Sequence, residues 1–401
     1  MSGPLFGYRV VELAEGVAGP YCAMLMGDAG ADVVKVERAE GDRSRGWGSK
    51  TAGDFGATYL VTNRNKRGVA VNLGTPEGVA AVKRLVDHAD IVIGDAGWTN
   101  HPELQPDAIL ERNPRVIYLN ISGFGKEGPL GDYPPYGELG AQLASEANLS
   151  LGVPGAAPVR VGVDIGSTYA GIYGLSATCA ALIARDRVGG QRIDVSPFGS
   201  LVAMRSTLWA AQSNPDEWWG FHLDSYMKPP DNGYHTKDSA VSFTLGRMPR
   251  EQRDDLYKDY QMEWVRDDPM FALVDTDSAG SGSRYGWQVR PVWEKAFAKF
   301  STAEVIEIGR RHGATVFEKN DYEQMINSPQ VQHLGMVTAV EHPGIGPVQQ
   351  LVPPWDFSDT PAEIRLPAPR LGEHSAEVLT EAGYSASEVA ALRSSGALVG
   401  V

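Results

Sequence analysis

The segment YRVVELAEGVAGPYCAMLMGDAGADVVKVER, residues 8 to 38, sets the fold of this chain. Two short runs rich in β-branched residues, Val10–Leu13 and Val33–Val36, flank an apolar helical pattern from Tyr21 to Ala29. A strand, a helix and a second strand at this spacing form a right-handed crossover between parallel strands. The segment therefore predicts a parallel sheet of the α/β class.

The same alternation continues through the first half of the chain. Further strands are predicted at Ala70–Leu73, Ile91–Ile93, Val116–Ile121 and Arg192–Val195, with a helix capped by Thr75 and opened by Pro76, and a long apolar helix at Tyr169–Arg187. Together these elements predict a large Rossmann-like domain over residues 1–205, which is a usual size for one domain.

The composition changes from about Leu208 onward, where tryptophans, prolines and charges replace the regular alternation. We interpret residues 206–228 as a linker, residues 229–330 as a smaller α+β domain, and residues 331–401 as a return segment that packs on the large domain. Local patterns predict a strand pair at Gly233–Leu245, helices at Val292–Phe300 and Ala303–His312, and two short helices within Glu373–Leu398, the second capped by Ser385 or Ser387.

Composition narrows the classes of function. The formal net charge of -14 in 401 residues, without clustered Lys and Arg, argues against nucleic acid or an anionic membrane as a partner. No long apolar run and no cationic leader is evident, so we expect a cytoplasmic protein. The eight histidines show no H-x-x-x-H or H-E-x-x-H spacing, so we expect no metal site.

Three stretches near the predicted strand ends favour an anionic ligand. The loop Glu12–Tyr21 carries glycines before a helix start, where backbone N–H groups bind anions, although it lacks the G-x-G-x-x-G pattern of dinucleotide enzymes. Two basic clusters, Gly41–Arg45 and Asn63–Arg67, follow predicted strands and suit a phosphorylated ligand. The alternative for each basic residue is a solvated surface position.

Seven phrases in order resemble the class III CoA-transferases, the carnitine dehydratase and bile-acid-inducible protein family. They are GVAGPYCAMLMGDAGADVVKVERAEGDRSR, NRNKRGVAVNL, ISGFGKEGPL, PVRVGVDIGSTYAGIYG, GGQRIDVS, FSDTP and APRLGEHSAEVL. The resemblance implies a Rossmann-like large domain, a small domain, an interlocked dimer, and CoA thioesters as substrates. It also implies that Arg38 and Lys66 lie near the CoA nucleotide and phosphates, and that the loop Ala14–Pro20, with Val17 and Ala18, lines the thioester end.

The phrase PVRVGVDIGSTYAGIYG, residues 158 to 174, departs from the family at the nucleophile. In relatives an Asp in this phrase attacks the acyl-CoA thioester, and the alignment places Ser167 in its position. A carboxylate is ionised at pH 7 and forms a reactive anhydride, whereas a serine hydroxyl needs a base and forms a stable ester. We therefore interpret Ser167 as a helix-capping hydroxyl. Asp164, three residues earlier, is either a fallback nucleophile or a residue that caps the helix.

Two further departures concern the CoA contacts and the lid. An Asn-Phe-Arg phrase that contacts CoA in relatives is replaced within Gly94–Thr99, and a glycine-rich lid is replaced by the bulky Asp216–Phe221. The interpretation is a non-catalytic subunit of a heteromeric CoA-transferase, paired with a paralogous chain that keeps the Asp. Known systems of this kind act in aromatic degradation, for example from succinyl-CoA to (R)-benzylsuccinate. Two alternatives stay open, a homodimeric enzyme that uses Asp164 or another carboxylate, and a CoA-binding relative without transferase activity.

Overall fold

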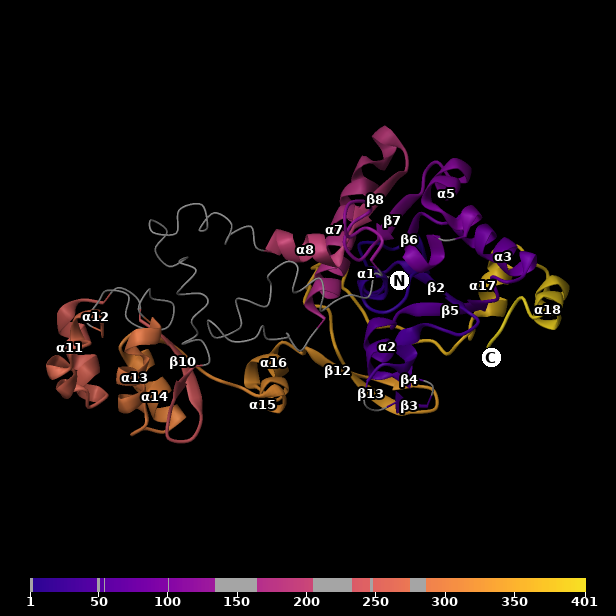
Figure 1. The fold of residues 1–401 in the computed structure, drawn as a ribbon. Helices are drawn as coiled ribbons and strands as arrows, with labels where there is room; N and C mark the ends of the chain where they lie inside the picture. Colours follow the sequence, from indigo (N-terminus) through magenta and orange to yellow (C-terminus); the bar gives the residue numbers. More distant parts are fainter. Residues whose placement is uncertain are drawn as a thin grey trace. The chain divides into compact units, whose positions relative to one another are not determined.

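The computed structural model describes residues 3–48, 51–53, 55–99, 101–133, 164–204, 233–245, 248–274 and 286–401 (Figure 1). The described residues of Met1–Ser145, Gly162–Ala203 and Pro329–Val401 form one compact unit, unit 1, and those of Met204–Ser328 form a second, unit 2. The predicted linker 206–228, with its phrase Asp216–Phe221, lies outside the described residues, as do residues 158–163 of the nucleophile phrase.

Unit 1 is built on a six-stranded sheet in which every pairing is parallel. In spatial order the strands are β5 (Lys66–Val71), β2 (Asp32–Arg38), β1 (Arg9–Leu13), β6 (Ile91–Asp95), β7 (Ile117–Ile121) and β8 (Gln191–Val195). When these six strands are numbered by their order along the chain, their spatial order is 3-2-1-4-5-6, which is the doubly wound arrangement of nucleotide-binding folds. The prediction of an α/β fold with a parallel sheet is confirmed.

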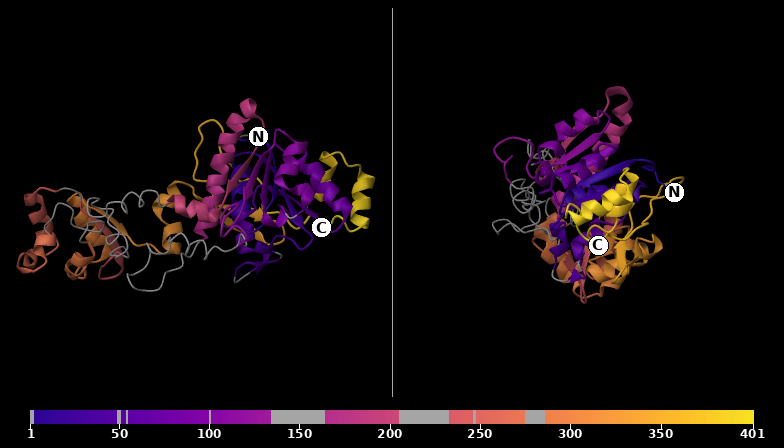
Figure 2. Two further views of the ribbon diagram at one scale, coloured as in Figure 1. Left: turned by 45° about the horizontal axis from the view of Figure 1, so that its top comes forward. Right: turned by 90° about the vertical axis from the view of Figure 1, so that its right-hand side faces the viewer.

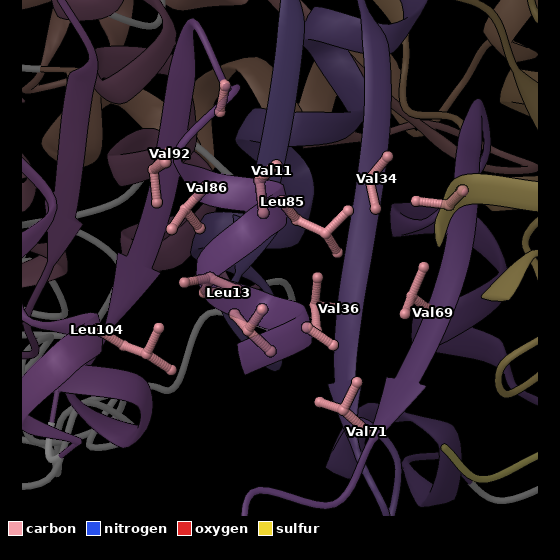
Figure 3. Close-up of a cluster of buried hydrophobic side chains, with 14 of the residues drawn as sticks. Val11, Leu13, Val34, Val36, Val69, Val71, Leu85, Val86, Val92 and Leu104 are labelled. Atoms are coloured by element: carbon pink, nitrogen blue, oxygen red, sulfur yellow. The ribbon is translucent and has the colours of Figure 1, made fainter. Parts of the chain in front are cut away.

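Apolar layers cover both faces of this sheet, as near-continuous valine and isoleucine strands require. One layer packs α1 (Ala18–Asp28) and α7 (Ile165–Val188) on residues such as Val10, Ile93 and Leu119. The other, drawn in part in Figure 3, packs α3 (Pro76–Val86) and α5 (Pro106–Arg112) against Val11, Val34 and Val92. Thr75 and Pro76 open α3 as predicted, with the Thr75 hydroxyl accepting the Gly78 N–H.

The C-terminal segment adds to the second layer. Helices α17 (Ser375–Glu381) and α18 (Ala386–Ser394) bring buried leucines and valines to the same cluster, and α18 is capped by Ser385, one of the two caps proposed. Leu398 pairs with Val71 at the end of β5. In every view the yellow C-terminal helices lie beside the purple N-terminal elements (Figures 1 and 2). The other α-helices described in unit 1 are α2 (Ala57–Thr62), α4 (Ala96–Thr99), α8 (Pro197–Met204, whose last residue falls in unit 2) and α16 (Pro329–His333). Two 3-10 helices lie at Arg43–Gly46 and Pro102–Leu104. Two antiparallel strand pairs join β3 (Thr51–Ala52) with β4 (Phe55–Gly56) and β12 (Val337–His342) with β13 (Gly346–Leu351).

Helix α7 approaches α1 closely because two glycines face it. A Cβ added at Gly171 would lie 3.0 Å from the Ala18 carbonyl oxygen, and one at Gly174 would lie 3.3 Å from the Cys22 sulfur, both in α1. Within the described residues α7 also meets the length and composition criteria for a membrane span, criteria that core helices meet as well. Its packing against α1 fixes where its first turn lies.

Unit 2 is an α+β body around an aromatic core. A three-stranded antiparallel sheet, β11 (Thr315–Glu318), β10 (Ala240–Thr244) and β9 (Tyr234–His235), packs with buried rings including Phe243, Trp293 and Phe297. The predicted strand pair is confirmed. The α-helices of its described residues are α11 (Arg250–Asp259), α12 (Phe271–Val274), α13 (Gly286–Phe297), α14 (Thr302–Arg311) and α15 (Tyr322–Ile326).

Candidate active site

The strand order of unit 1 reverses between β1 and β6, which pair with each other at the centre of the sheet. In open parallel sheets, ligands bind outside the carboxyl ends of the two strands at such a point, because their following loops diverge to opposite faces. Here the β1 loop carries Glu15, and β6 ends at Asp95. The fold therefore makes the surroundings of these two residues the candidate binding site.

A cavity of about 100 Å³ occupies this position. Its described lining comes from six segments of unit 1: Glu15, Val17, Ala18 and Gly19, then Arg43 and Trp47, then Asp95, then Ile121, then Asp164 and Ser167, and Pro197. The structure thus brings together four residues predicted separately from the sequence, Val17, Ala18, Asp164 and Ser167. A larger open hollow of about 510 Å³ beside β12 contains none of the predicted site residues.

The first turn of α7 presents Asp164 and Ser167 to the cavity. Asp164 is the residue before the helix, and its Oδ1 accepts the backbone N–H of Ser167 at 3.0 Å. Ser167 is the third helical residue and is largely buried. The interpretation of Ser167 as the helix cap was therefore wrong, because the Asp164 carboxylate already fills that role. The proposed capping role of Asp164 is confirmed.

Two buried aspartates hold the loop that follows β1. The Asp95 Oδ2 accepts the Glu15 N–H at 2.9 Å, and its Oδ1 accepts the Gly97 N–H at 2.9 Å. The Asp42 Oδ1 accepts the next N–H of the loop, that of Gly16, at 3.1 Å. Consecutive N–H groups are thereby anchored from two sides, so the following residues Val17 and Ala18 have a fixed position in the cavity wall.

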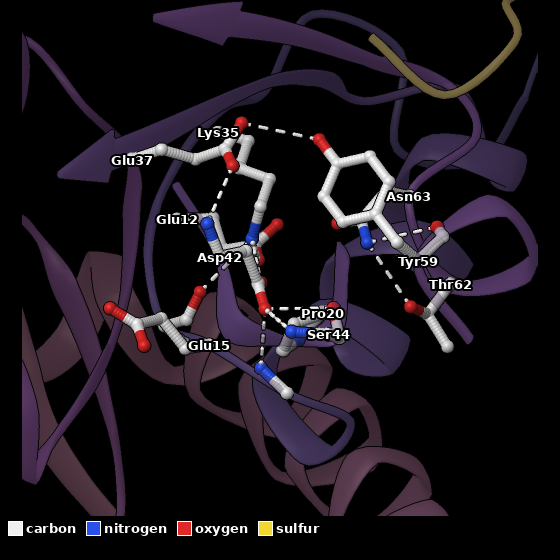
Figure 4. A network of polar contacts seen from close by, with 12 residues as sticks. Glu12, Glu15, Pro20, Lys35, Glu37, Asp42, Ser44, Tyr59, Thr62 and Asn63 are labelled. Carbon is white, nitrogen blue, oxygen red and sulfur yellow. Dashed lines mark hydrogen bonds and ion pairs between the residues drawn. The ribbon is translucent and has the colours of Figure 1, made fainter. Parts of the chain in front are cut away.

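A fully buried charge network lies behind this loop (Figure 4). The Glu12 carboxylate pairs with Lys35 through Oε1 at 2.8 Å and with Lys66 through Oε2 at 2.7 Å. Lys35 also pairs with Asp42 at 2.8 Å. Burial lowers the pKa of Lys66 to about 8, and the Glu12 charge partly offsets this effect. The network joins β1, β2 and β5 directly under the site.

The two cations expected near CoA differ in their surroundings. Lys66 donates to Glu12, the Pro20 carbonyl and Asn63 Oδ1, each within 2.8 Å, and faces the protein interior. Arg38, at the end of β2, is one-third exposed, lies 3.6 Å from Glu15 Oε1 and stacks over Trp98 at 5.4 Å. Arg38 is therefore the one of the two that solvent, and a ligand, can reach in this arrangement.

Asp95 and Glu15 are the site carboxylates that the sequence interpretation did not assign. Burial raises the pKa of Glu15, opposed by Arg38 and reinforced by Asp95. Burial also raises the pKa of Asp95, opposed by the N–H groups of Glu15 and Gly97. Their position in the sequence could have predicted this role, because both residues lie at or just after the carboxyl ends of adjacent central strands. Among the described residues, no group of His, Cys, Asp and Glu is arranged to hold a metal ion.

Asp42 is expected to make folding stability depend on acid pH. Burial alone would raise the pKa of Asp42, but Lys35 and Ser44 outweigh it and lower this pKa to about 2. The pKa of Asp42 is therefore lower in the folded chain than its value of about 4 in the unfolded chain. The ionised carboxylate adds about 2 kcal/mol to the free energy of unfolding above pH 4, and this stabilisation is lost as the pH falls to 2. The free energies of unfolding of the wild type and of Asp42→Asn, measured with urea, should therefore differ by about 2 kcal/mol less at pH 2 than at pH 6.

The control for this comparison is Asp186→Asn, which removes an acidic group whose side chain is 88% exposed and pairs with Arg115. Its stability difference from the wild type should stay within about 1 kcal/mol at each pH. A difference between wild type and Asp42→Asn that stays constant from pH 6 to 2 would contradict the assignment.

Comparisons with known proteins show which proteins this chain is similar to along its length. Residues 5–375 match the sequence profile described as CoA-transferase family III. The chain is 31% identical to a succinate–glutarate CoA-transferase of Agrobacterium fabrum, covering 94% of this chain and 95% of that one. It is 30% identical to the succinyl-CoA–L-malate CoA-transferase beta subunit of Chloroflexus aurantiacus, covering 94% of each. A crystal structure of a CAIB/BAIF family protein from Brucella suis superposes with a TM-score of 0.78 at 26% identity, covering 95% of this chain and all of that one.

Proposed function

Because this chain belongs to CoA-transferase family III, whose substrates are CoA thioesters, we propose that it is the non-catalytic subunit of a heteromeric transferase. On this proposal a paralogous chain supplies the nucleophilic Asp, and the complex moves CoA from a donor such as succinyl-CoA to a carboxylic acid. The two chains form an interlocked dimer in the cytoplasm. CoA contacts Arg38 and the Val17–Ala18 turn, and Lys66 supports that turn from within.

The observation that carries this proposal is the hydroxyl of Ser167 in the cavity at the start of α7. The family resemblance places a nucleophilic carboxylate there. Within the described part of the chain, the Ser167 hydroxyl forms no hydrogen bond to a histidine or lysine that would activate it as a nucleophile. The neighbouring Asp164 carboxylate holds the backbone N–H of Ser167. One relative is named as a beta subunit, which supports a division of labour between chains.

A second candidate is a self-sufficient enzyme that uses a different carboxylate of the cavity. Asp164 and Glu15 both line it. Of the two, Asp164 is held as the helix cap, whereas Glu15 faces Arg38 at 3.6 Å. A carboxylate taken out of water is more reactive toward a thioester because it has lost part of its solvation. This candidate makes the chain active without a partner.

The experiment that separates the two candidates is a labelling assay on the purified chain. The chain is incubated with succinyl-CoA, and its intact mass is recorded before and after hydroxylamine, which cleaves acyl and CoA adducts on carboxylates. We expect no adduct on the chain alone, and transferase activity with acids such as (R)-benzylsuccinate only after a paralog with an intact Asp is added. A hydroxylamine-sensitive adduct mapped to Asp164 or Glu15 would replace the first candidate with the second.

A further inference from the structure

Two segments that follow neighbouring strands meet in the wall of the cavity. The loop after β1 supplies one part of the described lining, and the 3-10 helix Arg43–Gly46 after β2, with the adjoining Trp47, supplies another. The contact between them is at Gly16, which has φ of +83°. A Cβ added there would lie 3.1 Å from an Arg43 nitrogen and 3.2 Å from Trp47. The shape of the cavity therefore depends on how these two segments are held relative to each other.

One carboxylate oxygen joins the two segments. The Asp42 Oδ1 accepts the Gly16 N–H of the loop at 3.1 Å. The same oxygen accepts the N–H and the hydroxyl of Ser44, in the 3-10 helix, at 2.8 and 2.7 Å. Asp42 is buried, and these three donors are neutral. An ionised carboxylate in such a place is costly to bury unless a counter-charge also contacts it.

Lys35 supplies the counter-charge. Its Nζ lies 2.8 Å from Asp42 Oδ2 and 2.8 Å from Glu12 Oε1, and it donates to the Ala14 carbonyl at 3.1 Å. These three contacts match the three N–H donors of an ammonium group, and the side chain is completely buried. Burial alone would lower the pKa of Lys35, but the carboxylates around it, first that of Asp42, outweigh burial and raise this pKa. Lys35 therefore stays charged.

Lys35 thereby holds the backbone of the loop on both sides of Glu15. It binds the preceding carbonyl, that of Ala14, directly, and it holds the following N–H, that of Gly16, through Asp42. A loop that is held at two consecutive peptide groups has lost much of its conformational freedom before a ligand arrives. The entropic cost of binding a ligand against this loop is correspondingly lower.

The second lysine of the buried network contacts other parts of the chain. Lys66 pairs with Glu12 and donates to the Pro20 carbonyl and to Asn63 Oδ1. None of these partners belongs to residues 14–16 of the loop or to the 3-10 helix. Of the two lysines, Lys35 is therefore the one that links the two segments of the wall.

We propose that Lys35 is a positioning residue of this site. Through the Ala14 carbonyl and Asp42 it holds the loop after β1 and the 3-10 helix after β2 in one arrangement, and so sets the affinity for the thioester end of CoA. Because its side chain is completely buried, Lys35 acts through these two segments and not by contact with the ligand. The inference rests on the proposed function in one respect, that the thioester end of CoA enters this cavity, and it is independent of which residue acts as nucleophile.

The test separates the two ends of CoA. Dissociation constants of succinyl-CoA and of adenosine 3′,5′-bisphosphate, which is the nucleotide end of CoA alone, are measured by calorimetry on the protein as purified, with any partner chain that co-purifies. Lys35→Met should weaken the binding of succinyl-CoA by about 10- to 100-fold, as expected for the loss of charge-assisted hydrogen bonds that hold the loop. The constant for the bisphosphate should stay unchanged. Lys35→Arg, which keeps the charge, should restore most of the affinity for succinyl-CoA.

The matched control is Lys83→Met, which removes a partly exposed lysine paired with Glu103 and should change neither constant. If Lys35→Met does not fold, Asp42→Asn decides, because its amide keeps an oxygen for the Gly16 N–H but presents an N–H₂ group to Lys35. The same selective loss is expected for it. Equal losses for both ligands, or no loss for either, would overturn the proposal, as would a failure of the wild type to bind either of them. None of these readouts depends on a covalent adduct, so they are separate from the labelling assay that tests the proposed function.

Discussion

Replacing Ser167 with Asp is expected to convert a chain that takes up no CoA into one that takes up one CoA per chain from succinyl-CoA. The new carboxylate would lie in the first turn of α7, where the helix dipole favours a negative charge, and in the lining of the cavity. It attacks the thioester carbon and releases the CoA thiolate. The thiolate then attacks the aspartyl carbonyl and releases succinate, which leaves an aspartyl–CoA thioester.

The measurement is the intact mass of the chain, which should rise by the mass of one CoA minus one water. After hydroxylamine the mass should fall to that of the aspartyl hydroxamate. Ser167→Asn is the matched control, since it has the same size and no nucleophile, and it should remain unlabelled. If Ser167→Asp binds succinyl-CoA but stays unlabelled, the absence of a carboxylate at position 167 is not the reason why this chain forms no CoA adduct. If the wild type is labelled to the same extent, the non-catalytic assignment is wrong.

Replacing Glu12 with Gln is expected to cost about 3 to 5 kcal/mol of folding stability. Glu12 is completely buried and is the shared partner of Lys35 and Lys66, at 2.8 and 2.7 Å. Lys35 keeps Asp42 as a partner, but the contacts that Lys66 keeps are with the neutral Pro20 carbonyl and Asn63 amide. A buried ammonium without a counter-charge is strongly unfavourable. The measurement is the urea midpoint of unfolding, converted with the transition slope.

The control is Glu307→Gln, which removes a carboxylate that is 75% exposed from its pair with Arg311, itself 55% exposed. Exposed pairs of this kind contribute about 1 kcal/mol or less. The double variant Glu12→Gln with Lys66→Met should lose less stability than the sum of the two single variants, because the two changes remove one interaction. Additive losses would show that Glu12 and Lys66 do not depend on each other.

The first residue of α7 was not predicted correctly from the local sequence. The sequence predicted a helix from Tyr169, but the helix begins at Ile165 and includes Gly166 and Thr168, which have low helix propensity. The Asp164 side chain caps it, and contact of Gly171 with α1 holds the turn in place. Capping and helix packing outweigh the low helix propensity of two residues.

The basic clusters show a second limit. Arg43 and Arg45 are two residues apart and look equivalent in the sequence, yet one lines the cavity and the other bonds Glu37 and Tyr59. Likewise, Lys66 looked like a phosphate ligand, and the structure surrounds it with acceptors from β1, from α1 and from Asn63, the residue after α2. Which partner each cation meets depends on strand order, and local patterns do not contain that order.

The sequence by itself determined the parallel α/β fold and the family resemblance, because strand and helix periodicity and side-chain identity are local properties of the chain. The resemblance implies that Ser167 stands at the position of the nucleophile. The tertiary structure decided that Glu15, Arg43, Asp95 and Ser167 share one cavity, and that Glu12, Lys35 and Lys66 form the support beneath it. The physical reason is that the reversal of strand order between β1 and β6 brings together loops from distant parts of the chain, and burial then requires each charge there to find a partner.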